Sequence, residues 1–118
     1  SRRFPPGKSM LPCAASSMKS KPVEYHPAAL LEAVAAYEWY EQREPGLGER
    51  LRIALQAGER FVARHPKLGE PYDHGTRKWH VPHFPYKLAY FDLPDRVQVI
   101  AVIHDSRRPG YWHWRLSH

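Results

Sequence analysis

Basic and aromatic side chains crowd the last part of the chain, directly after an apolar run: the residues from Ile100 to Arg115 read IAVIHDSRRPGYWHWR. Cleaving RNA through its 2′-hydroxyl needs a group that transfers protons and donors for the charge that develops on the phosphorane. His104 could transfer the protons, and Arg107 and Arg108 could hold the phosphate, because the planar guanidinium matches its oxygens. The same crowd could instead form a contact surface for a polyanion or a partner chain, or a rim that closes over the core.

Other side chains extend this candidate site. Tyr111 or Trp112 could stack on a base, although Trp112 and Trp114 alternate, so one of the two is expected to pack against the sheet. Arg77 could hold phosphate, or it could simply pair with an acid of the first helix. The residues that we expect to bind a target or phosphate are Arg77, Lys87, Arg107, Arg108, Tyr111, Trp112 and Arg115.

A metal site is only weakly indicated. His80, His83 and His113 are three histidines without an acid or thiolate at a fixed spacing, whereas zinc sites usually show such a spacing. Cys13 is the only cysteine, which excludes an internal disulfide framework and a cysteine-based zinc site. We therefore expect neither a metal nor a cofactor, and any nuclease activity would be metal-independent.

The net charge of +6 is unevenly distributed along the chain. Residues 1–22 hold five of the 18 Lys and Arg side chains and no acid, so the remaining 96 residues, with 13 bases and 12 acids, are nearly neutral. Six of the eight histidines lie in residues 72–118, where bases also outnumber acids. The overall charge is therefore weak support for a nucleic-acid binder, whereas the C-terminal half favours an acidic or polyanionic partner.

The length of 118 residues predicts a single domain. Residues 1–20 are rich in Pro, Ser and Lys and lack apolar periodicity, which predicts a poorly structured tail or a non-native extension, with Met18 resembling a native start. We therefore assign the domain to residues 21–118. No run of about 18 apolar residues and no apolar stretch of a secretory signal occur, so we expect a cytoplasmic protein without a membrane span.

Two helices are predicted in the first half of the domain, after a short strand at residues 22–25. The first begins at His26-Pro27 and continues through AALLEAVAAYEWYEQR, with an apolar stripe of Leu30, Val34 and Tyr37, thickened by Leu31 and Ala35, and with its glutamates facing elsewhere. The second follows Pro45-Gly46, has apolar residues at three- and four-residue spacing from Leu47 to Val62, and ends at His65-Pro66. A loop of about four residues makes the pair an antiparallel hairpin.

Three strands are predicted after Pro66. They span residues 77–81, 84–91 and 97–103, and Pro82 and Pro85 mark an edge, bulge or loop between the first two. In the last strand Val97, Val99, Ala101 and Ile103 should share one face, with Ile100 and Val102 on the other. The predicted order β-α-α-β-β-β gives an α+β fold in which the helical hairpin packs on a small antiparallel sheet.

The pattern of Val23 to Arg115 resembles the RelE/ParE superfamily of toxins from bacterial type II toxin–antitoxin pairs. The residues that carry the resemblance are the helix YHPAALLEAVAAYEWYE, the strand FPYKLAY and the ending H-x-x-R-R-P-x-Y-W, in this order and spacing. The resemblance implies a cytoplasmic toxin of the plasmid-stabilisation type that inhibits growth and is silenced by a small antitoxin. It also implies a groove between hairpin and sheet in which a partner helix could lie.

The superfamily divides by target, and both targets remain open here. RelE-like members bind the ribosome and cleave messenger RNA, and the resemblance would then assign His104, Arg107 and Arg108 to catalysis. ParE-like members inhibit DNA gyrase and are not known as nucleases. RelE-like members usually carry several lysines on the second helix and the sheet, whereas here the second helix has none, and the ending is closer to ParE-like members. We therefore expect a toxin that binds a protein such as gyrase, with a messenger RNA endoribonuclease, or a degenerate non-toxic partner-binding protein, as alternatives.

Overall fold

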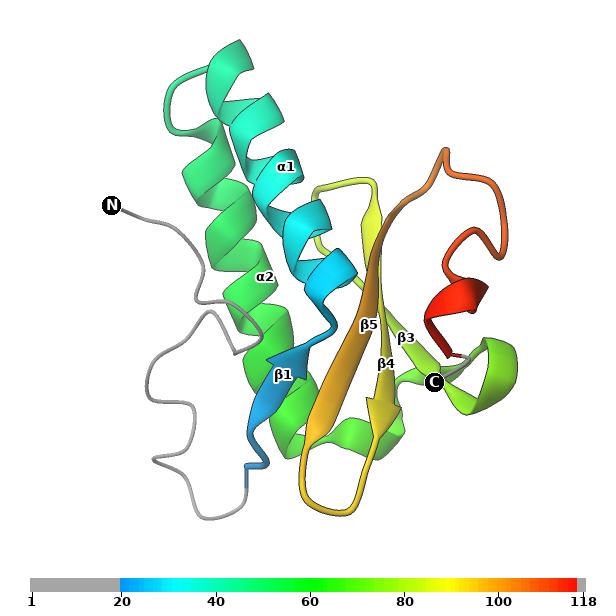
Figure 1. Ribbon diagram of the computed structural model, residues 1–118. Coiled ribbons are helices and arrows are strands. Elements are labelled where there is room, and N and C mark those ends of the chain that lie inside the picture. Colours follow the sequence, from blue (N-terminus) through cyan, green and yellow to red (C-terminus); the bar gives the residue numbers. More distant parts are fainter. Residues whose placement is uncertain (1–19, 117–118) are drawn as a thin grey trace.

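The computed structural model describes residues 20–116 (Figure 1). The tail predicted for residues 1–20 lies, apart from Ser20, outside the described residues. None of the helices in residues 20–116 is long and apolar enough to cross a membrane.

A helical hairpin and a five-stranded sheet form the domain, which confirms the predicted α+β fold. The helices are α1 (Pro27–Arg43) and α2 (Leu47–Arg64), and the strands are β1 (Val23–Tyr25), β2 (Glu70–Pro71), β3 (Arg77–His80), β4 (Tyr86–Asp92) and β5 (Val97–His104). The strand order is β1-β5-β4-β3-β2. The hairpin lies on one side of the sheet and the C-terminal segment on the other (Figure 1). This segment contains a short 3-10 helix, η4 (His113–Leu116).

The sheet is mixed instead of wholly antiparallel, because β1 pairs in parallel with β5. Strands β3, β4 and β5 pair antiparallel, as predicted, and the short β2, for which no strand was predicted, pairs antiparallel with β3. The chain passes from β1 directly into α1, and β5 follows only after the hairpin and the other strands, so a parallel pairing is available at this edge. The N-cap of α1 is His26, whose Nδ1 accepts a hydrogen bond from the Ala28 N–H at 3.0 Å.

The predicted stripe of helix α1 is confirmed for Leu30, Val34 and Tyr37, which lie in or against the core, and is wrong for Leu31 and Ala35, which are exposed. Ala29, Leu30, Ala33 and Ala36 are buried against the sheet and α2, whereas Leu31 is 70% exposed. Alanines let the helix axis approach the sheet closely, and this orientation rotates Leu31 outwards. The same rotation brings the Glu32 carboxylate towards β5, where it accepts a hydrogen bond from the Val102 N–H.

A β-bulge at Ile100 changes the face on which the end of β5 packs. Ala89 pairs with Ala101 and Tyr90 pairs with Val99, so Ile100 has no partner on β4. Beyond it, Val102 packs in the core under the helices, and Ala101 packs with Ile100 in a second core on the other face. The predicted sharing of one face by Val97, Val99, Ala101 and Ile103 is therefore wrong beyond the bulge, since an extra residue in one strand reverses the alternation that follows it.

Candidate functional site

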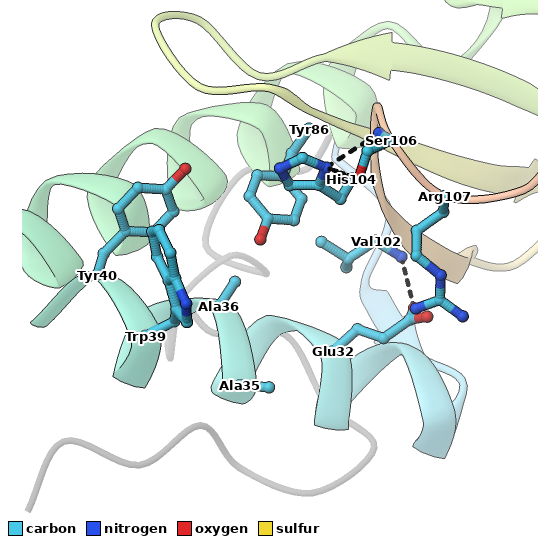
Figure 2. A pocket seen from close by; sticks show the side chains of 10 residues that line it. All are labelled: Glu32, Ala35, Ala36, Trp39, Tyr40, Tyr86, Val102, His104, Ser106 and Arg107. Atoms are coloured by element: carbon cyan, nitrogen blue, oxygen red, sulfur yellow. Dashed lines mark hydrogen bonds between the residues drawn. The ribbon is translucent and has the colours of Figure 1, made fainter. Parts of the chain in front are cut away.

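A cavity of about 430 Å³ lies between α1 and the C-terminal end of β5, and we call it the α1–β5 pocket. Figure 2 shows its lining side chains, which come from α1, β4, β5 and the turn that follows β5. The lining residues are Glu32, Ala35, Ala36, Trp39, Tyr40, Tyr86, Val102, His104, Ser106 and Arg107. The predicted proton-transfer residue and one of the predicted arginines thus meet at one cavity.

Apolar and aromatic groups form much of the pocket. The Tyr40 and Tyr86 rings lie 6.4 Å apart, and the His104 ring meets Tyr86 edge-on with the centroids 5.0 Å apart. Trp39 is 49% exposed at the mouth, where the Arg43 guanidinium lies 3.9 Å from the centroid of its ring. A half-exposed tryptophan beside a cavity is the kind of residue that anchors protein interfaces.

The hydrogen bonds of His104 fix which ring nitrogen carries the proton. The backbone N–H of Ser106 donates to His104 Nδ1 at 3.0 Å, and Ser106 Oγ lies 2.8 Å from the same nitrogen. A backbone N–H can only donate, so Nδ1 accepts and the neutral ring carries its proton on Nε2. In this state the ring can donate a hydrogen bond through Nε2, while Nδ1 is engaged by Ser106.

Arg107 supplies an exposed positive charge to the lining of the pocket. Its guanidinium stacks 3.8 Å from the centroid of the Tyr111 ring, and its backbone N–H donates to the His104 carbonyl. Among the residues that the structure describes, no carboxylate forms an ion pair with Arg107. The guanidinium therefore keeps its donors for a ligand, while the aromatic ring restricts its orientation.

Glu32 joins α1 to the end of β5 and to the C-terminal segment. Its carboxylate accepts from both terminal nitrogens of Arg115, at 2.8 and 2.9 Å, from the Tyr111 hydroxyl at 2.6 Å and from the Val102 N–H at 3.0 Å. Arg115 also donates to the Ile100 carbonyl at 2.9 Å. Glu32 and Arg115 thus provide hydrogen-bond partners for the Val102 N–H and the Ile100 carbonyl of β5. These backbone groups lie beyond the point where β1 stops pairing with β5. Burial, together with the hydrogen bond to Glu32, raises the pKa of Tyr111, so its hydroxyl remains a donor.

The remaining predicted residues are placed less favourably for binding a target. Trp112 is fully buried in the second core, so it has no free face for a base, and Arg115 is 7% exposed and paired with Glu32. Arg77 donates to the Gly69 carbonyl instead of pairing with an acid of the first helix, and Lys87 lies 3.8 Å from Asp105. The basic and aromatic residues after β5 are therefore of two kinds. Trp112 and Arg115 are buried and complete the core, whereas Arg107 is exposed at the pocket.

Two further predicted groups can be located. Arg108 is exposed on the turn after β5 but does not line the pocket, and Trp114 is 59% exposed, as expected for one of the two alternating tryptophans. Within residues 20–116, no three His, Cys, Asp or Glu side chains gather as ligands for a metal ion. His113 instead lies 3.0 Å from a carboxylate oxygen of Asp73.

One family model and one solved structure match this chain. Residues 23–109 match the model of the family described as the ParE toxin of the type II toxin–antitoxin system, parDE. A solved structure described as the chromosomal ParDE TA system from P. aeruginosa matches with a TM-score of 0.64 and 13% sequence identity, over 75% of this chain and 98% of that one. At this identity the structural likeness shows the fold alone. No curated protein sequence matches the chain.

Proposed function

The chain belongs to the family of ParE toxins of type II toxin–antitoxin systems, and from this premise we propose that it inhibits growth in the bacterial cytoplasm by binding a protein target such as DNA gyrase. We further propose that a cognate antitoxin neutralises it by covering the same surface. No catalytic step is part of this proposal. The α1–β5 pocket and the exposed turn around Arg107 and Arg108 form the contact surface.

The hydrogen-bonded state of His104 is the observation that carries the proposal. General base catalysis needs a nitrogen that accepts a proton within reach of the substrate. The Ser106 N–H occupies Nδ1, and the other nitrogen carries the proton of the neutral ring. The side chain is therefore suited to recognition through a donated hydrogen bond.

The distribution of cations supports the same conclusion. Binding to RNA gains affinity by displacing counterions, so it scales with the number of cations that reach phosphates. Arg107 is the one Lys or Arg among the described residues that line the pocket, Lys87 faces Asp105, and Arg115 is buried against Glu32. This leaves few cations at the pocket for an RNA backbone, while the half-exposed Trp39 favours a protein partner.

A metal-independent endoribonuclease acting on ribosome-bound messenger RNA is the second candidate. It is favoured by one observation, namely that His104 and Arg107 line the same cavity. For this activity the ring would have to break its hydrogen bond with the Ser106 N–H before Nδ1 could carry a proton. Arg107 and Arg108 would then stabilise the charge on the phosphorane.

Inducible expression of the chain without an antitoxin tests these two candidates side by side. We expect growth to stop, cells to become filamentous with DNA-damage signalling, and transcripts to remain intact, because a poisoned gyrase damages DNA without cutting RNA. The measurements are mapping of transcript 5′ ends and the superhelicity of a reporter plasmid. New 5′ ends with unchanged superhelicity would instead support the ribonuclease, and normal growth with soluble product would support a degenerate partner-binding protein.

A further inference from the structure

A second cavity, of about 490 Å³, is lined by α2 and by the loop that joins β3 to β4, and we call it the α2–loop pocket. Its lining residues are Leu47, Arg50, Ile53, Ala54, Ala57, Pro82, His83 and Phe84. Among the residues that the structure describes, none lines both this cavity and the α1–β5 pocket. Its volume lies within the range of about 300–1,000 Å³ that is usual for small-molecule sites.

The walls of the α2–loop pocket are largely apolar. Leu47, Ala54 and Ala57 follow one another at spacings of seven and three residues, so they share one face of α2. The loop supplies the ring of Phe84, which meets the Tyr40 ring edge-on with the centroids 5.2 Å apart. A hydrocarbon group that entered this pocket would therefore leave water for apolar surfaces that are already in place.

Arg50 adds an unpaired positive charge to this apolar lining. Its side chain is exposed and forms no ion pair, side-chain hydrogen bond or ring contact with another described residue. Glu49, its neighbour in the sequence, pairs with Arg52, and the described lining contains no acid. Arg50 is also the one Lys or Arg of the described lining, so a ligand with a single negative charge matches the pocket better than a phosphate backbone, which needs several cations in a row.

His83 adopts a backbone conformation that residues other than glycine rarely take. Its φ is 69°, in the left-handed region, where the Cβ atom of an L-residue approaches the following carbonyl oxygen too closely. The Phe84 N–H donates to the Val81 carbonyl at 3.4 Å, and Pro82 precedes His83, which is the pattern of a type II turn. Glycine is the usual residue at the third position of such a turn. A strained histidine at a cavity therefore indicates a function for its side chain.

We propose that the α2–loop pocket binds a small carboxylic acid with a hydrocarbon body, in its ionised form. The carboxylate pairs with Arg50, and the hydrocarbon lies against Ala54 and Phe84. The His83 side chain borders the ligand on the side of the turn, which accounts for a histidine where glycine would be less strained. This site goes beyond the proposed function and does not depend on it, since it shares no described lining residue with the α1–β5 pocket.

Titration of the purified full chain with octanoate and with its neutral analogue octanamide tests the proposal. Chemical shifts of the ¹⁵N-labelled protein at Ala54, Ala57 and Phe84 locate the binding site. We expect octanoate to bind about threefold more tightly than octanamide, because its charge pairs with an exposed arginine, and this preference should shrink in high salt. Octanoate should also bind at least about fourfold more tightly than hexanoate, because two more methylene groups leave water.

Substitutions in the pocket separate the role of the charge from that of the cavity. Arg50→Met should remove the preference for octanoate over octanamide. Its matched control is Arg60→Met, which removes an exposed arginine of α2 that does not line the pocket and should keep the preference. Ala57→Trp should block the binding of both probes, whereas Ala35→Trp, at the other cavity, should not.

Two substitutions of His83 test whether its strained conformation serves the ligand. His83→Gly and His83→Ala both remove the imidazole, so both should weaken octanoate binding by about threefold. Glycine also relieves the strain, so His83→Gly should melt at least about 2 °C higher than His83→Ala. Weaker binding by the more stable variant is a result that a purely structural histidine would not give.

Equal affinity for octanoate and octanamide would overturn the proposal, and so would unchanged binding by Ala57→Trp. An absence of shifts at Ala54, Ala57 and Phe84 would also overturn it, and would leave the pocket to a macromolecular partner. Unchanged octanoate binding by both His83 variants would contradict the role of that side chain. If a variant fails to fold, the comparison of the probes on the unaltered chain still decides.

Discussion

Replacement of Glu32 by glutamine is expected to lower the free energy of unfolding by about 3–5 kcal/mol, the usual cost of removing one partner of a buried ion pair. The loss is large because Arg115, with 5% of its side chain exposed, would keep its charge without a carboxylate. Val102 and Tyr111 would also lose the charge of their acceptor. Since domains of this kind are stable by only about 5–15 kcal/mol, urea denaturation should show a much lower midpoint.

Glu24→Gln provides the matched control for this substitution. Glu24 pairs with Arg96 at 3.2 Å, but 49% of its side chain is exposed, so its loss should cost less than about 1 kcal/mol. The double variant Glu32→Met with Arg115→Met should cost less than the sum of the two single changes, because no unpaired buried charge remains. A cost for Glu32→Gln as small as that for Glu24→Gln would show that this pair does not hold the C-terminal segment in place.

Filling the α1–β5 pocket should abolish most of the activity without unfolding the protein. Ala35 is exposed and lines the cavity, so in Ala35→Trp the indole can occupy the space where a partner side chain would insert. Loss of a central interface contact typically costs at least about 2 kcal/mol, or roughly 30-fold in affinity. We therefore expect Ala35→Trp to weaken growth inhibition by at least about that factor, measured as the inducer concentration that halves growth.

Ala57→Trp is the control for added aromatic bulk. Ala57 is also exposed, but it lies on α2 beside a separate groove lined by Leu47, Ile53 and Phe84. Growth inhibition by Ala57→Trp should match that of the unaltered chain, and circular dichroism should show both variants folded. Reduced inhibition by Ala57→Trp, with full inhibition by Ala35→Trp, would show that the contact surface lies on α2 and not on α1.

The order of the elements could be predicted from the sequence because local signals agree with the fold. Pro27 begins α1, Pro45-Gly46 separates the helices, and the apolar spacing of α2 reappears as its buried face. The exact limits of the buried face of α1, which exclude Leu31 and Ala35, could not be predicted in the same way. The first half of α1 is apolar on nearly every side, so periodicity gives little preference, and only the close packing of Ala29 and Ala33 against neighbouring elements decides the rotation.

The role of Glu32 was missed because it depends on contacts across the whole chain. Arg115 is 83 residues away, and Tyr111 is 79 residues away. A signal was present, since Glu32 is an acid within an otherwise apolar run and the C-terminal segment carries several arginines. No rule of spacing, however, connects a helix carboxylate with one particular arginine of that segment.

The bulge in β5 decides which of the basic and aromatic residues after β5 are buried and which are exposed. Ile100 adds one residue to β5, so Ile103 faces the side on which Trp112 packs. The sequence pattern of alternating apolar residues gives no indication of a bulge, because both faces of β5 are apolar. The candidates nearest the strand end, His104 and Arg107, lie at a cavity, whereas Trp112 and Arg115 are buried and complete the fold.

We propose that this toxin acts by binding through the α1–β5 pocket and not by cleaving RNA. The most direct measurement adds the purified chain, in parallel, to a gyrase supercoiling reaction and to translating ribosomes carrying a reporter message. We expect inhibition of supercoiling that Ala35→Trp weakens and Ala57→Trp does not, with no new 5′ ends on the message. Cleavage of the message by the unaltered chain, with supercoiling unaffected at the same concentrations, would contradict it.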